Sequence, residues 1–245
     1  MQQRRAPRRV LLKISGNALA GQGVAVPFGL QALDFIAAQL DQARQTGVQL
    51  AVVVGGGNII RGAAFCPDGA GRLRAYYAGM LATVVNVLVL RDRLEAAGVP
   101  VAHYAAVGIP RMAEAFAPER ALADLESGRL VLLGGGTGSP LFTTDTAAAL
   151  RAVELGADLL LKATRVDGVY TADPEKDADA QLFPRLTYAE VLKRRLRVMD
   201  LTAVSFCLEH RLPLRVFNYA VDGNIRRAAC GEPVGTLIGS PEDAD

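Results

Sequence analysis

The sequence predicts an α/β fold with a mostly parallel central sheet that helices cover on both faces. Short apolar runs alternate with longer segments of helical period, and this alternation is typical of parallel sheets. The runs are rich in Val, Leu and Ile, as expected for strands buried on both faces. A chain of 245 residues with 51% hydrophobic content can bury a large core. We expect residues 1–245 to form one domain, because there is no internal repeat and no low-complexity linker.

The N-terminal half is predicted from apolar runs that alternate with segments of helical period. The first run contains a single lysine, and the second leads into three glycines. In order, we expect a strand VLLKIS (10–15), a helix near 29–46, a strand VQLAVVV (48–54), a helix near 76–97, a strand VPVAHY (99–104), a helix near 118–127 and a strand RLVLL (129–133).

The C-terminal half continues the alternation, and local signals mark its helix ends. Thr187 and Glu190 form a capping box, and Gly231 stands where a helix should stop. The segment 164–186 is rich in Asp, Gly, Pro and Thr, and a loop of this length is often functional. In order, we expect a helix near 144–156, a strand DLLLKA (158–163), helices near 187–195 and 198–210, a strand LPLRVF (212–217) and a helix near 222–230.

Two predicted strands end in glycine turns, at 55–57 and at 134–136. Consecutive glycines let another group approach the backbone, and successive N–H groups in such a turn can bind an anion. Ligands of parallel sheets bind at the carboxyl ends of the strands, where both turns are expected. The turns therefore predict a phosphate site, with a tight turn that binds nothing as the alternative.

Lys13 and the segment 137–146 add to this prediction. Lys13 interrupts an apolar strand, and a buried ammonium without an anion nearby is costly; a surface lysine at a strand end is the alternative. The segment TGSPLFTTDT opens an alanine-rich helix, so its N–H groups and hydroxyls converge on a positive helix end. Asp145 within it is a candidate for the reaction centre or, more simply, a helix cap.

Several classes of protein are excluded or disfavoured. Neither GxxxxGK[ST] nor GxGxxG is present, which argues against a P-loop NTPase or a dinucleotide-binding enzyme. The net charge of +2 gives no reason to expect nucleic acid or a membrane as partner. Cys66, Cys207 and Cys230 lack the spacing of a zinc site or a disulfide framework, so we expect a reducing cytoplasm. We also find no apolar run near the roughly 18 residues of a membrane span, and no apolar secretion signal in MQQRRAPRR.

At this point the motifs resemble those of the bacterial UMP kinases of the amino acid kinase family. They occur in the family's order over nearly the whole chain, and as a set they are specific. The matching stretches are LLKISGNAL (11–19), VVVGGGNIIRG (52–62), GMLAT (79–83), GTGSPLFTTDT (136–146), LLKATRVDGVYTADPEKD (160–177), LTYAEVL (186–192), VMDLTA (198–203), LPLRVFN (212–218) and GTLI (235–238).

The resemblance implies an αβα sandwich that phosphorylates UMP with ATP and Mg²⁺. The N-terminal part would receive UMP, and the C-terminal part, about 155–245, would receive ATP. It further implies a cytoplasmic homohexamer that makes UDP for pyrimidine nucleotide synthesis. Phosphoryl transfer depends mainly on positioning and charge neutralisation, and the acceptor phosphate is itself ionised near neutral pH, so no general base is needed. His103 and His210 lie outside every motif and are expected to be structural.

The resemblance also implies roles for individual residues. Lys13, Arg61 and Asp145 would be catalytic, and Asp200 would support them. The ATP-binding residues would be Lys13, Ser15, Gly16, Gly57, Arg61, Thr164, Tyr170 and Asp173. The UMP-binding residues would be Gly56, Tyr76, Thr137, Gly138, Ser139, Pro140, Leu141, Phe142, Thr143 and Thr144.

The sequence departs from the family pattern at the ribose position. The family has an acidic residue three positions before GMLAT, where this chain has Tyr76, and a phenol cannot give two hydroxyls a shared anionic acceptor. Asp68 from a rearranged loop is another source of that contact. Asn17 and Ser139 also differ from the family's usual residues. On the surface where the family binds GTP, Arg91 matches the family pattern and Glu95 does not. A kinase with another phosphate or carboxylate acceptor, and a weakly catalytic nucleotide-binding paralogue, are therefore the alternative hypotheses.

Overall fold

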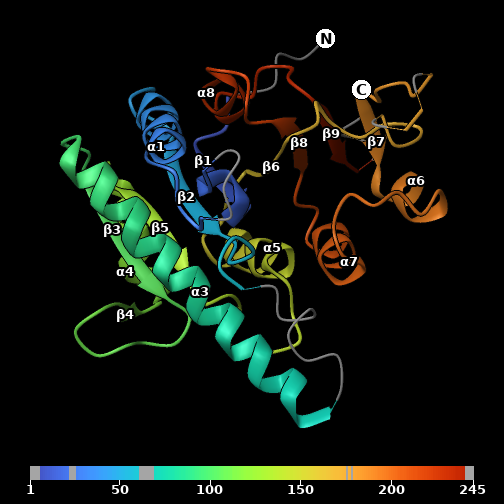
Figure 1. Cartoon of the computed structure of the whole chain (residues 1–245). Coiled ribbons are helices and arrows are strands. Elements are labelled where there is room, and N and C mark those ends of the chain that lie inside the picture. The colour runs from blue at the N-terminus through green and yellow to red at the C-terminus, as the bar shows by residue number, and fades with distance from the viewer. Residues whose placement is uncertain (1–5, 22–25, 61–68, 175, 178, 241–245) are drawn as a thin grey trace.

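The computed structural model describes residues 6–21, 26–60, 69–174, 176–177 and 179–240. Its centre is a nine-stranded sheet of order β4-β3-β5-β2-β1-β6-β8-β9-β7 (Figure 1). Every neighbouring pair is parallel except β8 and β9, which confirms the predicted mostly parallel α/β sheet. The strands are β1 (Arg9–Ile14), β2 (Gln49–Val54), β3 (Val101–Ala105), β4 (Glu114–Ala115), β5 (Leu130–Gly134), β6 (Leu159–Thr164), β7 (Arg185–Thr187), β8 (Leu214–Asn218) and β9 (Thr236–Gly239).

Helices lie on both faces of this sheet, and each face has its own apolar core. Leu33, Leu90 and Ile225 bring α1, α3 and α8 onto one face, whereas Leu125 and Val204 bring α4 and α7 onto the other, together with α5. The helical elements are η1 (Gly16–Leu19), α1 (Leu30–Arg44), α3 (Gly69–Ala96), α4 (Pro118–Glu126), α5 (Thr144–Glu154), α6 (Tyr188–Lys193), α7 (Leu201–Glu209) and α8 (Asn224–Ala229).

The structure adds three short strands to the prediction and lengthens one helix. β4, β7 and β9 have two to four residues, too few to show a periodicity in the sequence. Helix α3 begins at Gly69 rather than near residue 76, because its first turns stand outside the core and carry no helical apolar pattern. The capping box of Thr187 and Glu190 is present at the start of α6, as predicted.

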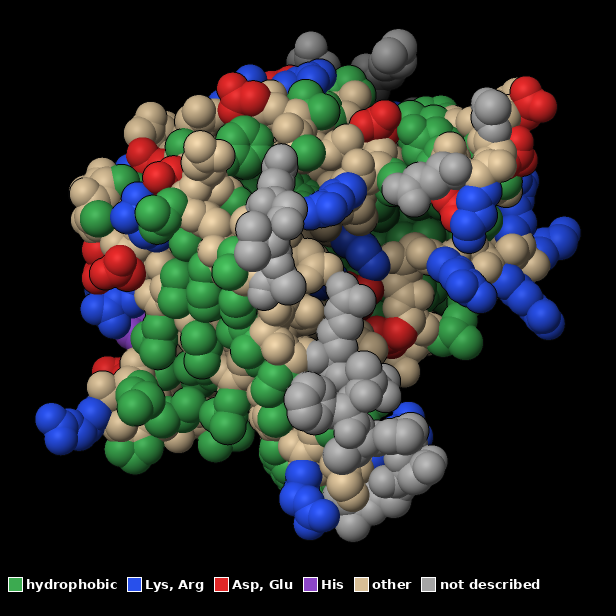
Figure 2. All heavy atoms as spheres, in the orientation of Figure 1, with side chains coloured by type: hydrophobic (Ala, Val, Ile, Leu, Met, Phe, Trp, Pro, Cys, Tyr) green, Lys and Arg blue, Asp and Glu red, His purple; other side chains and the backbone are tan. Residues whose placement is uncertain are grey.

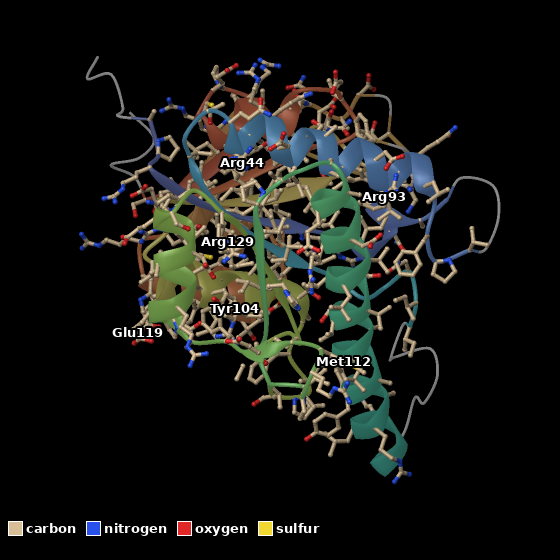
Figure 3. All side chains as sticks on the ribbon, turned by 90° about the vertical axis from the view of Figure 1, so that its left-hand side faces the viewer. Arg44, Arg93, Tyr104, Met112, Glu119 and Arg129 are labelled. Atoms are coloured by element: carbon tan, nitrogen blue, oxygen red, sulfur yellow. The ribbon has the colours of Figure 1, made fainter. Side chains whose placement is uncertain are left out.

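Polar contacts fasten helices to their neighbours at the β3 edge (Figure 3). The Tyr104 hydroxyl on β3 donates to Asp124 of α4 across 2.5 Å. Burial, reinforced by this carboxylate, raises the pKa of Tyr104 to about 12. On the other face, Arg93 Nε of α3 donates to Asp34 of α1 across 2.9 Å. The first contact joins α4 to β3, and the second joins α3, which also lines the candidate site, to α1.

Helix α3 is unusually apolar. Its segment Gly71–Ala96 is the one helix, within the ranges given above, whose length and mean hydropathy of 1.5 would suffice to cross a membrane. No such run was expected from the sequence, because Gly, Tyr, Thr and Asn interrupt the apolar residues; the mean hydropathy of the segment is high nevertheless. Val87, Leu90 and Leu94 are buried against the sheet, so α3 is a core helix.

The outer face of α3 carries exposed hydrophobic side chains at four-residue spacing, which we call the α3 stripe. It consists of Leu73, Tyr77, Leu81 and Val85, whose exposed fractions lie between 42% and 56%. Figure 2 shows green side chains gathered over the middle of this helix. Residues four apart lie on one side of a helix, so the stripe forms a continuous apolar strip on the surface.

Candidate active site

Two lysines and one aspartate meet at the centre of the sheet. Lys13 of β1 and Lys162 of β6 are paired directly across neighbouring parallel strands. Lys13 Nζ lies 2.8 Å from Asp145 Oδ1, and Lys162 Nζ lies 2.7 Å from Asp145 Oδ2. Lys162 Nζ also donates to the Val198 carbonyl oxygen. The Asp145 carboxylate, at the start of α5, is therefore held between two ammonium groups.

The electrostatics of this cluster keep Asp145 ionised. Burial tends to raise the pKa of its carboxyl, but the charges of Lys13 and Lys162 outweigh burial and hold that pKa below its usual range. Burial lowers the pKa of Lys162, and Asp145 only partly offsets that effect. Two ammoniums and one carboxylate leave an excess positive charge, and each of the three side chains is only 13–15% exposed. A second anion would stabilise this arrangement.

The start of α5 is fixed by hydrogen bonds. Thr143 Oγ1 accepts from the N–H of Asp145 at 3.0 Å and of Thr146 at 3.3 Å, which caps the helix. Asp200 in turn accepts from the hydroxyls of Thr143 and Thr146 and caps α7 through the N–H of Ala203. Asp200 thus joins α7 to α5 and orients the turn that carries Asp145.

A cavity of about 250 Å³ adjoins this cluster at the carboxyl ends of β2 and β5. Both glycine turns contribute to its wall, together with α3 and the segment before α5. The residues that line it are Gly56, Gly57, Ile60, Ala75, Tyr76, Gly79, Met80, Thr83, Gly136, Thr137, Ser139, Phe142, Thr143 and Thr144. The structure therefore brings seven of the ten residues predicted for UMP binding into one pocket, which we call the acceptor pocket.

Three other residues predicted for UMP binding, Gly138, Pro140 and Leu141, belong to the same loop but do not line the acceptor pocket. Gly138 has a positive φ of 88° and donates its N–H to Gly135 across 3.2 Å, so it shapes the turn. Leu141 has φ of 75°, which is unusual for a side chain of its size, and is 60% exposed. Strained backbone of this kind is frequent at ligand sites.

Most residues predicted for ATP binding lie around β1, β6 and the segment that follows β6, whereas Gly57 follows β2 and lines the acceptor pocket. Ser15 Oγ accepts from the Asn17 N–H and caps η1. Thr164 is the last residue of β6. Its hydroxyl lies within hydrogen-bond distance of the backbone carbonyls of Val166 and Phe217.

Farther along this segment, the Tyr170 hydroxyl donates to Asp167 across 3.3 Å, and Asp173 pairs with Lys176 at 3.2 Å. The segment is attached to β9 by a hydrogen bond of 2.8 Å, which the Val169 N–H donates to Thr236 Oγ1.

The space around Gly16, close to Lys13, is too small for a side chain. A Cβ at this position would lie 2.1 Å from Asn58 Oδ1 and 2.6 Å from the Gly55 carbonyl oxygen. The turn after β1 and the turn after β2 therefore touch backbone to backbone. This contact places the two turns side by side, as a site between two phosphate groups requires.

Two predicted positions, Arg61 and Asp68, lie outside the described residues, as does Cys66. Lys162 is the residue that sequence reasoning did not single out, although it lies within a quoted motif. The signal was present, because Lys162 interrupts the apolar strand LLLKAT as Lys13 interrupts VLLKIS. The pairing of β1 with β6, which makes the two lysines neighbours, is not visible in the sequence.

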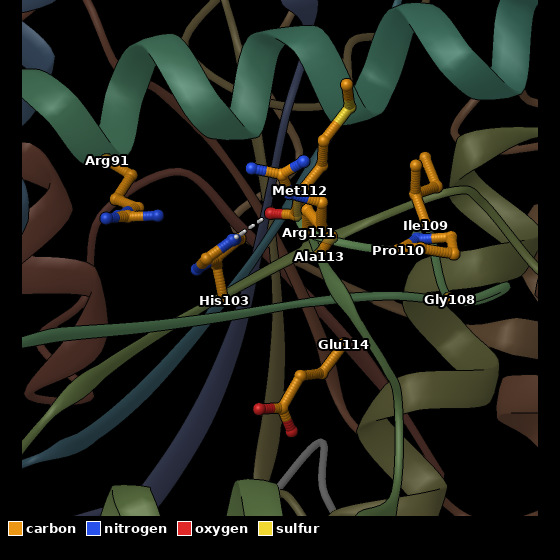
Figure 4. A pocket seen from close by; sticks show the side chains of 9 residues that line it. All are labelled: Arg91, His103, Gly108, Ile109, Pro110, Arg111, Met112, Ala113 and Glu114. Carbon is orange, nitrogen blue, oxygen red and sulfur yellow. Dashed lines mark hydrogen bonds between the residues drawn. The ribbon is translucent and has the colours of Figure 1, made fainter.

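A larger cavity of about 620 Å³ lies elsewhere, between α3 and the β3–β4 connection (Figure 4). His103 Nε2 donates to the Met112 carbonyl oxygen at 2.9 Å, so His103 has a structural partner there. Arg91 faces the same cavity and pairs with Glu95 at 2.8 Å. His210 lies far from the lysine pair in sequence and stacks on Phe206 with ring centroids 4.4 Å apart.

Comparisons with known proteins agree with this geometry. The model of the amino acid kinase family matches residues 8–218. A UMP kinase from Bacillus anthracis is 36% identical, with a TM-score of 0.92 over 97% of this chain and 98% of its own. A UMP kinase from Ureaplasma parvum is 29% identical, with a TM-score of 0.88 over 97% of this chain and all of its own. A uridylate kinase from Archaeoglobus fulgidus is also 29% identical, with a TM-score of 0.69 over 94% and 99% of the two chains.

Proposed function

This chain belongs to the amino acid kinase family, and we propose that it transfers the γ-phosphoryl group of ATP to UMP, giving ADP and UDP. The observation that carries the proposal is the cluster of Lys13, Asp145 and Lys162 beside the acceptor pocket. The similarity to UMP kinases over nearly the whole of both chains selects UMP as the acceptor. The two alternatives raised by the sequence, another acceptor or a weakly catalytic paralogue, are not favoured by these similarities.

The reaction needs charge neutralisation and alignment. A phosphate oxygen of UMP attacks the γ-phosphorus of ATP, a new P–O bond forms, and the bond to the β-phosphate oxygen breaks as ADP leaves. Lys13 and Lys162 supply the excess positive charge that would neutralise the negative charge of the phosphates. Asp145 lies between the two ammoniums and holds each in place through an ion pair. Its lowered pKa means that it does not take up a proton at neutral pH.

We further propose that Mg²⁺ arrives with ATP. Across the part of the chain that the structure describes, no group of three or more His, Cys, Asp or Glu side chains is arranged to hold a metal. Mg²⁺ is commonly bound by one or two carboxylates together with substrate phosphates and waters, and Asp145 is the carboxylate nearest the lysine pair. When bound, the ion supplies neutralisation of phosphate charge. Chelation of Mg²⁺ is expected to stop turnover while UMP binding, measured by calorimetry, persists.

Tyr76 sets how the acceptor pocket holds the ribose. It lies on α3 and lines the pocket, with the guanidinium carbon of Arg72 6.0 Å from its ring centroid. A carboxylate at this position would supply the ribose hydroxyls with a charge-assisted bond that the phenol cannot give, worth about 1.5–3 kcal/mol. We therefore propose that Tyr76 makes the KM for UMP about ten- to a hundredfold higher than an acidic residue would.

The test measures ADP release with Mg²⁺ and ATP in the presence of UMP, CMP, dUMP or no acceptor. Tyr76→Asp is expected to lower the KM for UMP, and Tyr76→Phe, the matched control, is expected to leave it near the wild-type value. dUMP, which lacks one ribose hydroxyl, should gain much less from Tyr76→Asp. ATP binding without turnover on any of these acceptors would overturn the assignment as an enzyme.

The α3 stripe supports a proposal about assembly. Monomeric soluble proteins seldom expose a continuous apolar strip of this kind, and its spacing matches a helix packed along a second helix. We propose that a second copy of the chain covers the stripe within a homohexamer, as the resemblance implies. We also propose that the protein acts in the cytoplasm, in pyrimidine nucleotide synthesis.

A further inference from the structure

Helix α3 touches both glycine turns of the acceptor pocket through two polar side chains that are almost wholly buried. Thr83 is 4% exposed and Asn86 is not exposed at all. They are three residues apart, so they lie on one side of the helix, one turn from each other. Buried polar groups are retained where their hydrogen bonds are satisfied. Each side chain here has a hydrogen bond to the backbone of a glycine turn and a further bond to another group.

Thr83 holds the second turn. Its hydroxyl accepts from the Gly135 N–H at 2.7 Å and donates to the Met80 carbonyl oxygen of its own helix at 2.7 Å. Gly135 and Gly136 both have positive φ, of 78° and 61°. A hydroxyl that donates to the helix has its lone pairs free to accept from Gly135. Thr83 therefore fixes the peptide at which the chain turns from β5 into the loop that lines the pocket.

Asn86 holds the first turn. Its Nδ2 donates to the Gly55 carbonyl oxygen at 2.6 Å and to Asn58 Oδ1 at 2.7 Å. Because the peptide is planar and trans, the carbonyl of Gly55 and the N–H of Gly56 point in opposite directions. Fixing that carbonyl toward α3 therefore fixes the direction of the Gly56 N–H, and Gly56 lines the acceptor pocket.

The same amide reaches the turn that follows β1. A Cβ at Gly16 would lie 2.8 Å from Asn86 Nδ2, so the backbone beside Lys13 rests against this side chain. Asn58 completes the contact by donating to the Pro27 carbonyl oxygen at 2.8 Å. Two turns of the site are thus in contact with one buried amide on α3, and Asn58 links them to Pro27.

We propose that Thr83 and Asn86 are positioning residues that fix, from one helix, the distance between the two glycine turns that hold the acceptor phosphate. This inference rests on the proposed function and deepens it. Thr83 lines the acceptor pocket, but its hydroxyl is already bonded to Met80 and Gly135, so it acts through the backbone that it holds, as Asn86 does. A small displacement of aligned groups can cost about a hundredfold in rate, so loss of either contact is expected to weaken catalysis more than stability.

The experiment compares Thr83→Val, which removes the hydroxyl but keeps the shape, with Thr83→Ser, which restores the hydroxyl. Thr83→Val is expected to lower kcat/KM for UMP about ten- to a hundredfold and to leave the KM for ATP unchanged. Thr83→Ser is expected to recover most of the loss. Tyr188→Phe is the matched control, because it removes a buried hydroxyl that bonds the Leu212 carbonyl oxygen away from the pocket.

The proposal is overturned if Thr83→Val and Tyr188→Phe lose stability alike while both keep the wild-type kcat/KM for UMP. A variant that fails to fold is replaced by a measurement on the wild type, hydrogen exchange of the glycine turns with and without UMP. Turns held by α3 are protected before UMP is added. Protection that appears only with UMP would show that the substrate orders the turns and would refute the proposal. Hydrogen exchange also separates a failure of this proposal from a failure of the proposed function, because protection of the turns does not depend on turnover of UMP.

Discussion

Replacing Asp145 by Asn is expected to destabilise the fold strongly at neutral pH. The substitution keeps the size of the side chain but leaves Lys13 and Lys162 as neighbouring ammoniums without a counter-charge. Their positions are fixed by the register of β1 and β6, and their side chains are only 13% and 15% exposed. Removing one member of a buried charge cluster typically costs about 3–5 kcal/mol in the free energy of unfolding.

The loss should become smaller as the pH rises. The pKa of Lys162 already lies below its ordinary value of 10.5 through burial, and removing Asp145 lowers it further. The unfolded chain keeps the ordinary pKa, so between the two values it binds more protons than the folded chain. Stability therefore increases with pH in that window, with the same sign as the contribution of an aspartate with a lowered pKa but in the alkaline rather than the acid range.

The assay is urea unfolding followed by far-ultraviolet circular dichroism, since the chain has no tryptophan, at one protein concentration and from about pH 7 to about pH 10. The control is Asp34→Asn, because Asp34 is 55% exposed in its pair with Arg93 and should contribute at most about 1 kcal/mol. An Asp145→Asn protein as stable as the wild type at neutral pH, or one whose loss does not change with pH, would refute the electrostatic reasoning.

Three further predictions concern activity, the backbone and assembly. Lys162→Met is expected to abolish phosphoryl transfer while UMP binding by calorimetry stays near wild type; equal losses of both would instead indicate general disruption around Asp145. Gly235→Ala should lower the free energy of unfolding by more than about 1 kcal/mol, because Gly235 has φ of 67° and a Cβ would lie 2.0 Å from the Val216 carbonyl oxygen. Leu81→Lys should reduce the mass measured by light scattering, and an unchanged mass would show that the α3 stripe is not a subunit contact.

The order of strands and helices could be predicted from the sequence, because parallel strands buried on both faces leave continuous apolar runs. The candidate site was also predictable in part. Lys13 and the glycine turns are local signals, each readable within about ten residues of sequence. These signals depend on backbone freedom and on charge within an apolar run, which need no knowledge of the tertiary fold.

Features that depend on pairing between distant segments could not be predicted. Lys162 becomes part of the centre only because β6 pairs with β1, and residue 162 is far from residue 13 in the chain. The buried partners of Thr83 and Asn86 are backbone groups of the glycine turns, so nothing in the helical pattern of α3 marks these two residues. The short strand β9 was missed because it has four residues and pairs antiparallel with β8.

The sheet order has a consequence for the synthesis of the protein. Strands β1 to β5 are contiguous in the sheet, so the half that holds the acceptor pocket can assemble while later residues are still being translated. Strand β7 joins the sheet only through β9, which lies about fifty residues later in the chain. At about 5–20 residues per second, the segment that carries Tyr170 and Asp173 waits several seconds for its anchoring strand. During that interval a nascent chain has the half with the acceptor pocket formed, whereas the segment after β6 still lacks its anchoring strand.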